Sequence, residues 1–292
     1  MRRSAYAMLA PLVALFVLVA AVPLARAVWW ASHGGGGIAG GGGAGFVGGG
    51  HFRRLLSDRV LLFALVNTLG FTLAYVALLV PVSVGLALLL NRRGVFARGL
   101  FRTMLFSTHL VGAIYVAVLL GMLLARDTGA FSGLLPTGFD PLAQPMLAMP
   151  IVLVASLWMS AGYATVYVLA ALQSVDPEQL DAARMDGATA AGLFRHITLP
   201  AIGPTLAFVA LVASIGGLQL FELPFLLFQT GGGGGGAGPG NAALTLSMYL
   251  FSVAFEQGDF GYATAIGWVL AVIVTGLSYS LVRRTGAVGG AT

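Results

Sequence analysis

The stretch QLDAARMDGATAAGLFRHITLP, residues 179–200, lies between two long apolar runs and carries an unusual concentration of charge. Four ionisable side chains and one histidine fall within sixteen positions of it: Asp181, Arg184, Asp186, Arg195 and His196. A segment with so many charges is too polar to cross a bilayer. If the apolar runs on either side of it are membrane spans, this segment must lie at a membrane surface.

The residues in and before this stretch predict two short helices joined by a tight turn. Asp176 is suited to cap the first helix, Pro177 to its first position and Gln179 to complete a capping box. Gly187 is expected to end that helix, because glycine adopts the left-handed conformation at little cost. A second short helix is expected over about 189–197, so that the segment forms a compact hairpin.

Two interpretations of this hairpin are open. A solvated connecting loop needs neither paired caps nor the apolar side chains of Met185, Leu193 and Phe194. Apolar side chains on the surface of a short polar hairpin favour docking into a partner protein. Pro200 and Pro204 are expected to mark where the hairpin ends and the next span begins.

The composition predicts a helical integral membrane protein. Of 292 residues, 58% are hydrophobic and 9% are charged, whereas about 25% are charged in a soluble domain. Several apolar runs exceed the roughly 18 residues that cross a bilayer, and the alternating strands of a membrane barrel are absent. The predicted fold class is all-α integral membrane, with six transmembrane helices over about 8–30, 60–90, 104–125, 146–173, 204–228 and 263–282.

Two residue types are missing from the chain. Without cysteine there are no disulfides, thiolate metal sites or cysteine nucleophiles. All fifteen basic residues are arginine, so there is no lysine for a P-loop or a Schiff base. The net charge of +5 is attributed to membrane orientation, and no nucleic acid partner is expected.

The arginines set the expected orientation, because cytoplasmic loops are enriched in basic residues. Ten lie on one side of the six spans and five on the other, so the side with both termini and the hairpin is expected to be cytoplasmic. The ten are Arg2, Arg3, Arg92, Arg93, Arg98, Arg102, Arg184, Arg195, Arg283 and Arg284; the five are Arg26, Arg53, Arg54, Arg59 and Arg126.

Residues 1–30 admit two interpretations. They read either as an uncleaved anchor or as a signal peptide with Ala25-Arg26-Ala27 as its cleavage box. The anchor is favoured, because the apolar run is long and an arginine inside the cleavage box is unusual. Two glycine-rich segments, 34–50 and 231–240, are expected to be flexible external loop insertions.

The hairpin resembles the EAA motif of ABC-importer permeases, E-A-A-x(3)-G-x(9)-I-x-L-P. Asp181-Ala182-Ala183, Gly187 and Ile197-Thr198-Leu199-Pro200 match its spacing, with aspartate in place of the usual glutamate. The whole run is similar to carbohydrate-importer permeases of the maltose, lactose and glycerol-phosphate type. The resemblance covers about residues 50–284. It extends to Asn67-Thr68, Asn91-Arg92-Arg93, Ala170-Ala171-Leu172-Gln173, Phe255 and Gly261-Tyr262-Ala263.

This resemblance implies a MetI-like fold, a second permease subunit, an ATP-binding cassette ATPase dimer and an extracytoplasmic solute-binding protein that delivers a sugar. The chain itself is then no enzyme and holds no cofactor, since the partner ATPase binds ATP. The hairpin would transmit ATPase closure to rocking of spans 4 and 5. The residues implied in ATPase coupling are Asp181, Ala182, Ala183, Asp186, Gly187, Phe194, Ile197, Leu199 and Pro200.

The expected organisation has three parts. Residues 1–58 hold the first transmembrane helix and a glycine-rich external loop. Residues 59–284 form the MetI-like transmembrane domain with the coupling loop 176–200, and residues 285–292 form a cytoplasmic tail.

Polar side chains within the predicted spans are candidates for the transport pathway, because such groups are rare at membrane depth. Gln219 and Glu222 in span 5 are three residues apart and so share a helical face. A carboxylate at mid-bilayer costs about 2.5–3.5 kcal/mol on insertion scales, which a water-filled cavity offsets. The alternative places Glu222 near the outer interface. Span 3 adds His109, and span 4 adds Ser160 and Tyr163.

Hydroxyl, amide and carboxylate groups beside aromatic faces suit a sugar. In the maltose-type permeases that the chain resembles, sugar contacts come from the places that here hold His109, Ser160, Tyr163, Gln219 and Glu222. The chain departs from its relatives at Thr108, where proline is usual, and this leaves the helix shape around His109 open. His109 has an alternative role as a packing residue, and Trp158 is expected to face lipid or to pack.

Other functions fit the sequence less well. A secondary transporter would need inverted repeats, broken spans and coupling carboxylates, and it would leave the hairpin unexplained. A membrane enzyme is not favoured either, because the sequence has no paired acids within a span and no histidines at metal-ligand spacing. A permease for glycerol phosphate or another small polar solute remains the alternative to one for a sugar. A phosphate would favour cationic side chains in the spans, where no arginine is predicted.

Overall fold

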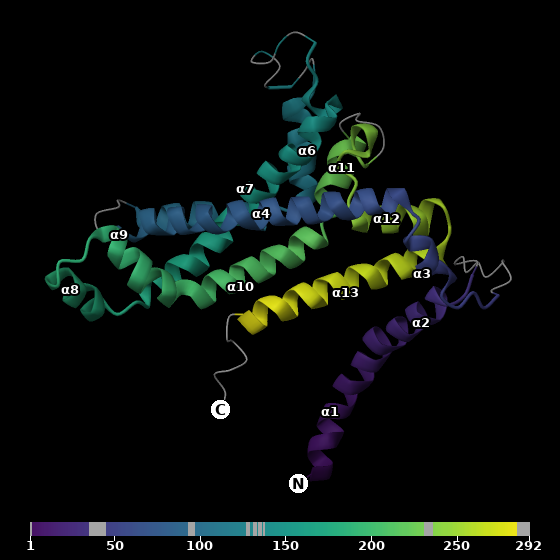
Figure 1. Cartoon of the computed structure of the whole chain (residues 1–292), viewed down its shortest axis with the longest axis horizontal. Helices are drawn as coiled ribbons and strands as arrows, with labels where there is room; N and C mark the ends of the chain where they lie inside the picture. The colour runs from purple at the N-terminus through teal and green to yellow at the C-terminus, as the bar shows by residue number, and fades with distance from the viewer. Residues whose placement is uncertain are drawn as a thin grey trace. The chain divides into compact units, whose positions relative to one another are not determined.

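A computed structural model of the chain describes residues 2–34, 45–92, 97–126, 129–130, 133, 136, 138–230 and 236–284. Every regular element within these ranges is helical (Figure 1). The α-helices are α1 (Arg2–Phe16), α2 (Val22–Ala31), α3 (Gly50–Leu55), α4 (Arg59–Asn91), α5 (Arg98–Leu110), α6 (Ala113–Leu124), α7 (Pro145–Gln173), α8 (Pro177–Met185), α9 (Ala190–Leu193), α10 (Leu199–Leu218), α11 (Glu222–Thr230), α12 (Leu246–Phe251) and α13 (Phe260–Arg284). Short π-helical turns at Val17–Ala21, Phe194–Thr198 and Ser252–Glu256 and 3-10 turns at Pro141–Ala143 and Pro239–Asn241 complete them.

Among these residues, five helical stretches are long and apolar enough to cross a membrane. They are Leu9–Ala31, Arg59–Asn91, Pro145–Gln173, Ala190–Leu218 and Phe260–Arg283. A sixth span results if α5 and α6 are counted together, although the chain bends by 93° between them. The all-helical membrane fold expected from the composition is therefore confirmed.

The fifth span corrects the sequence-based prediction of one helix over 204–228. The helix begins at Ala190, runs through the π-helical turn Phe194–Thr198 and ends at Leu218, and α11 follows as a separate helix. Pro200 and Pro204 do not interrupt it. A π-helical turn inserts an extra residue into the helical ring, which lets the helix accommodate nearby proline with its missing N–H.

The described residues divide into two compact units. One consists of Met1–Leu62 and Leu246–Val272, and the other of Phe63–Thr245 and Ile273–Thr292. In the first unit an antiparallel bridge between His33 and Phe46 connects the end of α2 to the segment before α3.

The second unit contains the hydrophobic core that supports the candidate pocket. Helices α5 and α10 each pack along α7. Helix α6 packs along α11 (Figure 1). Large side chains with no exposed surface fill the centre, among them Leu79, Val152, Val168 and Ile202. Outward apolar side chains such as Leu73, 74% exposed, need lipid or another protein around them.

Two glycines allow helices of the second unit to approach closely. A Cβ atom on Gly162 in α7 would lie 1.7 Å from the carbonyl oxygen of Leu105 in α5. A Cβ atom on Gly217 in α10 would lie 2.8 Å from the hydroxyl of Thr72 in α4. Small residues at such crossings are typical of membrane helix packing, because they let backbones come into contact.

The glycine-rich segments are only partly described. Residues 45–50 and 236–240 form turns, in which Gly48 and Gly238 have φ angles of +57° and +75°. The predicted flexibility of residues 35–44 and 231–235, and the predicted cytoplasmic tail 285–292, lie outside the described residues.

Candidate functional site: a polar pocket and a capped hairpin

The hairpin predicted at residues 176–200 is present, and both of its helices are capped, the first by Asp176 as expected. The Asp176 carboxylate accepts a hydrogen bond from the backbone N–H of Glu178 at 2.9 Å. The Thr189 hydroxyl accepts one from the backbone N–H of Gly192 at 3.2 Å. These bonds satisfy N–H groups that the first turn of each helix leaves without a helical partner.

The turn between the two helices depends on Gly187, whose φ is +80°. The Gly187 N–H donates to the Arg184 carbonyl at 3.1 Å, and the Ala188 N–H donates to the Ala183 carbonyl at 3.0 Å. This pair of bonds is a Schellman motif, which ends a helix with a left-handed residue. The predicted role of Gly187 as a helix terminator is therefore confirmed.

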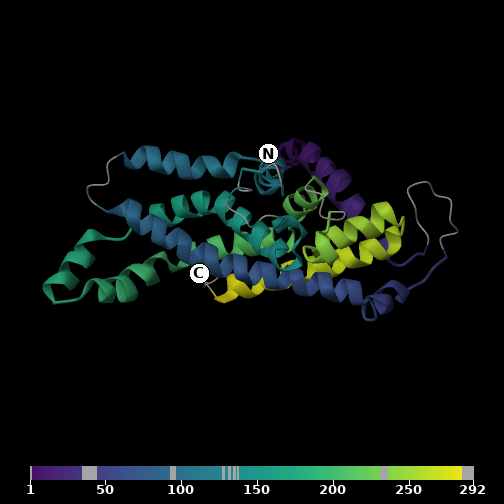
Figure 2. The same ribbon diagram turned by 90° about the horizontal axis from the view of Figure 1, so that it is seen from above.

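On the outer surface of the hairpin, which projects beyond the ends of α7 and α10 (Figure 2), Met185 is the most exposed large apolar side chain, at 88%. Leu193 and Phe194 are only half exposed, which corrects the expectation of a wider apolar surface. They belong to a helix that continues directly into the span. Of the residues expected to couple to an ATPase, Asp181, Ala182, Asp186, Gly187, Leu199 and Pro200 are exposed, and Ala183, Phe194 and Ile197 are half-buried.

A pocket of about 400 Å³ lies in the second unit and is lined by four of the five candidate substrate residues: His109, Ser160, Gln219 and Glu222. Tyr163 does not line it. The Tyr163 ring lies 4.5 Å from the His109 ring at an interplanar angle of 45° and so supports the imidazole. Pockets of this size accommodate small ligands.

One wall of the pocket is the break between α10 and α11, which the sequence did not reveal. Gln219 is the C-cap of α10, with its N–H bonded to the Ile215 carbonyl at 3.1 Å, and Glu222 begins α11. The prediction that the two side chains share one helical face is therefore wrong. The break nevertheless brings both side chains to the pocket. The Thr245 hydroxyl donates to the Leu220 carbonyl at 2.7 Å and satisfies this oxygen at the break.

The opposite break lies in the third span, directly after His109. Helix α5 ends at Leu110, the backbone of Val111 and Gly112 is extended, and α6 starts at 93° to α5. The missing proline at Thr108 does not remove the bend. The Thr108 hydroxyl instead bonds to the Leu105 carbonyl at 2.8 Å, within the last turns of α5.

Both breaks adjoin the same pocket, since His109 and Ala113 come from one and Gln219 to Glu222 from the other. The helices that follow the breaks, α6 and α11, pack against each other (Figure 1). Discontinuous helices around a polar site are a feature of many transporters. The sequence analysis treated broken spans as a mark of a secondary transporter. Because this chain has them as well, they do not distinguish that class from other transport proteins.

Sequence reasoning missed the aromatic part of the pocket. Phe71 and Tyr75 of α4 line it, with their rings 5.7 Å apart and nearly parallel. Ser156, Met159 and Phe221 line it as well. The i, i+4 spacing of Phe71 and Tyr75 was a weak signal, because α4 is apolar on every side and its pattern does not single out one face.

The ionisable lining of the pocket is acidic and not basic. Glu222 is the only carboxylate among the lining residues, and no arginine is among them. Throughout the described ranges, no three histidine, aspartate or glutamate side chains lie close enough together to hold a metal ion. The site can therefore offer hydrogen-bond acceptors and aromatic faces to a polar ligand.

The fold and this pocket define a multi-pass membrane transport subunit. Residues 80–286 match the model of the family described as binding-protein-dependent transport system inner membrane component, and the chain belongs to this family. It is a family of ABC-importer permeases, which are transport subunits of the inner membrane and not enzymes. Its members work with an ATPase and a solute-binding protein.

Individual relatives cover most of the chain. A probable ABC transporter permease of Sinorhizobium fredii is 33% identical over 277 residues, which are 94% of this chain and 87% of the relative. The lactose transport system permease protein of Rhizobium radiobacter is 32% identical, covering 80% and 79%. The crystal structure of a bacterial alginate ABC transporter contains a chain with a TM-score of 0.80 and 25% identity, covering 98% of this chain and 94% of that one.

Proposed function

We propose that this chain carries a sugar across the membrane through the pocket at the two helix breaks. In this proposal it forms half of a translocation pathway, and a second permease subunit forms the other half. The observation that carries the proposal is the convergence of His109, Ser160, Gln219 and Glu222 on one pocket. Relatives named for lactose, arabinooligosaccharides and trehalose or maltose support the substrate class.

The pocket has the chemistry that a sugar requires. The stacked rings of Phe71 and Tyr75 offer an apolar surface for the C–H faces of a pyranose. Gln219, Ser160 and His109 can hydrogen-bond to hydroxyl groups in either direction, and Glu222 can accept from them. Tyr163 contributes by holding the His109 ring in place.

The acidic pocket favours a neutral sugar over a phosphorylated or acidic one. A bound phosphate or carboxylate is usually paired with arginine or lysine, and the residues around this pocket include neither. The Glu222 carboxylate would repel such an anion at short range in a medium of low dielectric constant. Glycerol phosphate therefore remains the less favoured substrate.

The hairpin is the proposed site at which the partner ATPase is coupled to transport. The exposed residues Asp181, Met185 and Asp186 and the turn at Gly187 are proposed to seat in a partner ATPase, so that the hairpin and both chain termini face the cytoplasm. Because the hairpin helix continues without a break from Ala190 to Leu218, a movement at the ATPase reaches the pocket wall at Gln219. In functional terms we divide the chain as 1–58, 59–284 and 285–292.

The test is sugar uptake by the complete transporter in proteoliposomes, with lactose, maltose and arabinooligosaccharide offered through the binding protein. Glu222→Ala removes a charge-assisted hydrogen bond worth about 1.5–3 kcal/mol. It is expected to raise the half-saturating sugar concentration roughly ten- to hundredfold. Assembly with the ATPase should be unchanged, because the hairpin lies elsewhere in the fold.

Glu256→Ala is the matched control, since Glu256 is an exposed acid outside the pocket that bonds to Ser252. Its uptake should follow the same sugar dependence as the unchanged protein. If Glu222→Ala also leaves the sugar dependence unchanged, Glu222 does not contact the sugar and the pocket assignment is wrong.

A further inference from the structure

The segment 45–59, between the first two spans, is attached to the end of the first. The Val47 and Gly48 N–H groups donate to the Ser32 carbonyl at 2.9 and 3.0 Å. The His33 ring stacks on Trp29 with centroids 4.2 Å apart and meets the edge of Phe46 at 5.4 Å. These contacts hold the start of the segment at the C-terminal end of α2.

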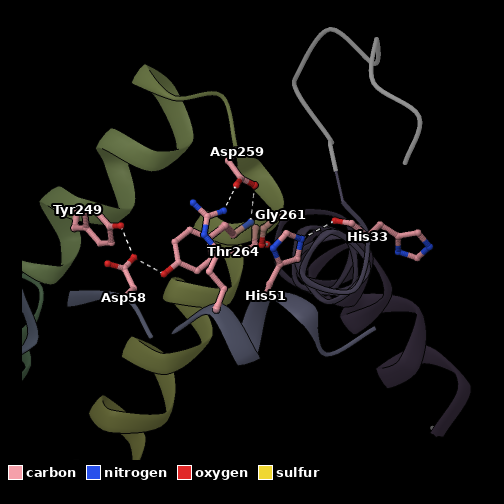
Figure 3. A network of polar contacts seen from close by, with 9 residues as sticks. His33, His51, Asp58, Tyr249, Asp259, Gly261 and Thr264 are labelled. Atoms are coloured by element: carbon pink, nitrogen blue, oxygen red, sulfur yellow. Dashed lines mark hydrogen bonds and ion pairs between the residues drawn. The ribbon is translucent and has the colours of Figure 1, made fainter. Parts of the chain in front are cut away.

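A second set of contacts holds the end of the segment against the start of α13 (Figure 3). The Asp58 carboxylate accepts hydrogen bonds from the hydroxyls of Tyr249 and Tyr262, each at 2.5 Å. Arg54 pairs with Asp259 at 2.7 Å and lies 4.0 Å from the centroid of the Tyr262 ring. The segment is therefore fixed at both ends within the first unit.

The Asp58 and Asp259 carboxylates also cap helices. Asp58 accepts from the Val60 and Leu61 N–H groups at the start of α4, at 2.9 and 3.2 Å. Asp259 accepts from the Tyr262 N–H at the start of α13, at 3.0 Å. Each acid thus joins the start of one span to a side chain from another part of the unit.

The inward side chains of the segment are buried against the rest of the first unit. His51 is buried, with its Nε2 atom 3.1 Å from the His33 carbonyl oxygen (Figure 3), and Leu55, four residues later in α3, is buried as well. A Cβ atom on Gly261 would lie 2.7 Å from both the His51 Nε2 atom and the His33 oxygen, so only glycine fits there. One face of α3 is therefore packed against the unit.

The outward side chains are apolar and cationic. Phe46 is 77% exposed and Leu56 is 83% exposed, and Phe52 is exposed as well. Arg53 and Arg59 are exposed, and within the described ranges neither forms an ion pair. The adjoining spans also expose apolar side chains near the segment in sequence, which are Val28 and Trp29 of α2 and Val60 and Leu62 of α4.

We infer that residues 46–59 are an interfacial anchor whose ligand is the anionic phospholipid surface of the bilayer. The segment joins the ends of two spans, so its outward face meets the headgroup region, where amphipathic elements insert apolar side chains. Phe46, Phe52 and Leu56 reach the acyl boundary, and Arg53 and Arg59 bind lipid phosphate groups. This inference rests on the membrane-spanning fold and not on the identity of the transported sugar.

The depth of the segment can be measured directly, because the chain has no cysteine. A nitroxide label is attached to Leu56→Cys in the complete transporter in nanodiscs, and its collision with oxygen and with a nickel chelate is compared. We expect a label at residue 56 to collide more often with oxygen than with the nickel chelate, as labels at the headgroup–acyl boundary do. The control label at Met185→Cys on the hairpin, 88% exposed in the chain itself, is measured in the membrane subunits before the ATPase is added, and there it should favour the nickel chelate. A nickel-favouring profile at residue 56 would overturn the inference. So would shielding of that label only after the solute-binding protein is added, which would make the face a protein-docking surface.

The charge component is tested with paired substitutions. A cationic side chain near an anionic membrane surface contributes about a fivefold gain in binding. Arg53→Gln with Arg59→Gln should therefore weaken the affinity for phosphatidylglycerol roughly 25-fold, seen as a higher phosphatidylglycerol content at half-maximal thermal stabilisation. Arg53→Lys with Arg59→Lys should stay close to the unchanged protein. If inorganic phosphate stabilises the protein as much as phosphatidylglycerol does, the two arginines bind a free anion and not a lipid. If the double glutamine variant keeps the lipid dependence of the unchanged protein, Arg53 and Arg59 do not bind headgroups. Sugar uptake in phosphatidylcholine is measured alongside, since the pocket should work whatever the result at this face.

Discussion

At the scale of single residues, Asp58 illustrates how several weak contacts set the properties of one group. Partial burial acts to raise the pKa of the Asp58 carboxyl. The hydroxyls of Tyr249 and Tyr262 and the backbone N–H groups of Leu61 and Val60 all donate to the carboxylate, and together they hold its pKa below the ordinary value.

A carboxyl whose pKa is lower in the folded state stabilises the fold above its unfolded pKa, near 4. That contribution is lost as the pH falls through the lower, folded pKa. We therefore expect the melting temperature of the unchanged protein to fall more steeply below about pH 4 than that of Asp58→Asn. Between pH 5 and 7 the two should show parallel pH dependence. Glu178→Gln, which alters an exposed acid in α8, is the control and should follow the unchanged protein. Parallel melting curves for Asp58→Asn across the acidic range would contradict the assignment.

Gly162 makes the closest helix contact described here, and we expect any side chain at this position to separate α5 from α7. Its added Cβ atom would meet the backbone of Leu105, which cannot move aside as a flexible side chain can. Gly162→Ala should lower the free energy of unfolding by about 1–3 kcal/mol, as overpacked cores do. Thermal unfolding in detergent measures the effect. Gly70→Ala in α4, where a Cβ atom meets nothing within 4 Å, is the control, and equal melting of the two variants would refute the close contact.

Local residue roles were predictable from sequence, but contacts between distant residues were not. Asp176 and Gly187 act within a few positions of themselves, so capping rules were sufficient to assign them. The bond between Asp58 and Tyr262 joins residues 204 positions apart, and no local pattern indicates it. The same limit concealed Tyr75, which joins the pocket only after α4 has packed.

At the scale of elements, the hairpin turn is the device that we expect to couple the chain to its ATPase. Gly187→Val places a β-branched residue at a φ of +80°, which costs roughly 1–3 kcal/mol of strain. Membrane insertion should continue normally, since the spans are unchanged, but sugar uptake and co-purification of the ATPase should both decrease. Gly203→Val in α10 is the control, because its backbone is helical and a Cβ atom there meets nothing within 4 Å. Normal uptake by Gly187→Val would show that the turn does not transmit force.

The spans were predictable to within a few residues at most of their ends, because long apolar runs define them. The break between α10 and α11 was not, since the long run that contains it is apolar apart from Gln219 and Glu222. Hydropathy measures whether a segment is in the membrane and not whether its helix is continuous. The pair Gly216-Gly217 immediately before the break was the available signal, as glycine weakens a helix.

In the whole molecule, we propose one pocket as the route of the sugar and one hairpin as the place where ATP hydrolysis by the partner is coupled to transport. The pocket is built from four spans, through residues of α4, α5, α7 and the α10–α11 break. Its composition was partly predictable, because buried polar residues in spans are conspicuous. Its shape was not, because it depends on two helix breaks meeting.

The most direct test of this account is protection of a pocket cysteine by the sugar. Ser160→Cys is nearly isosteric and introduces the only thiol of the chain, and the complete transporter is treated with a charged, water-soluble thiosulfonate with and without the sugar that it imports. The account predicts that the thiol at residue 160 reacts and that sugar slows the reaction. A thiol at Val66→Cys, on an exposed apolar position of α4, should not react. Modification of residue 160 at the same rate with and without sugar, in a transporter that still imports it, would contradict the claim that the sugar passes through this pocket.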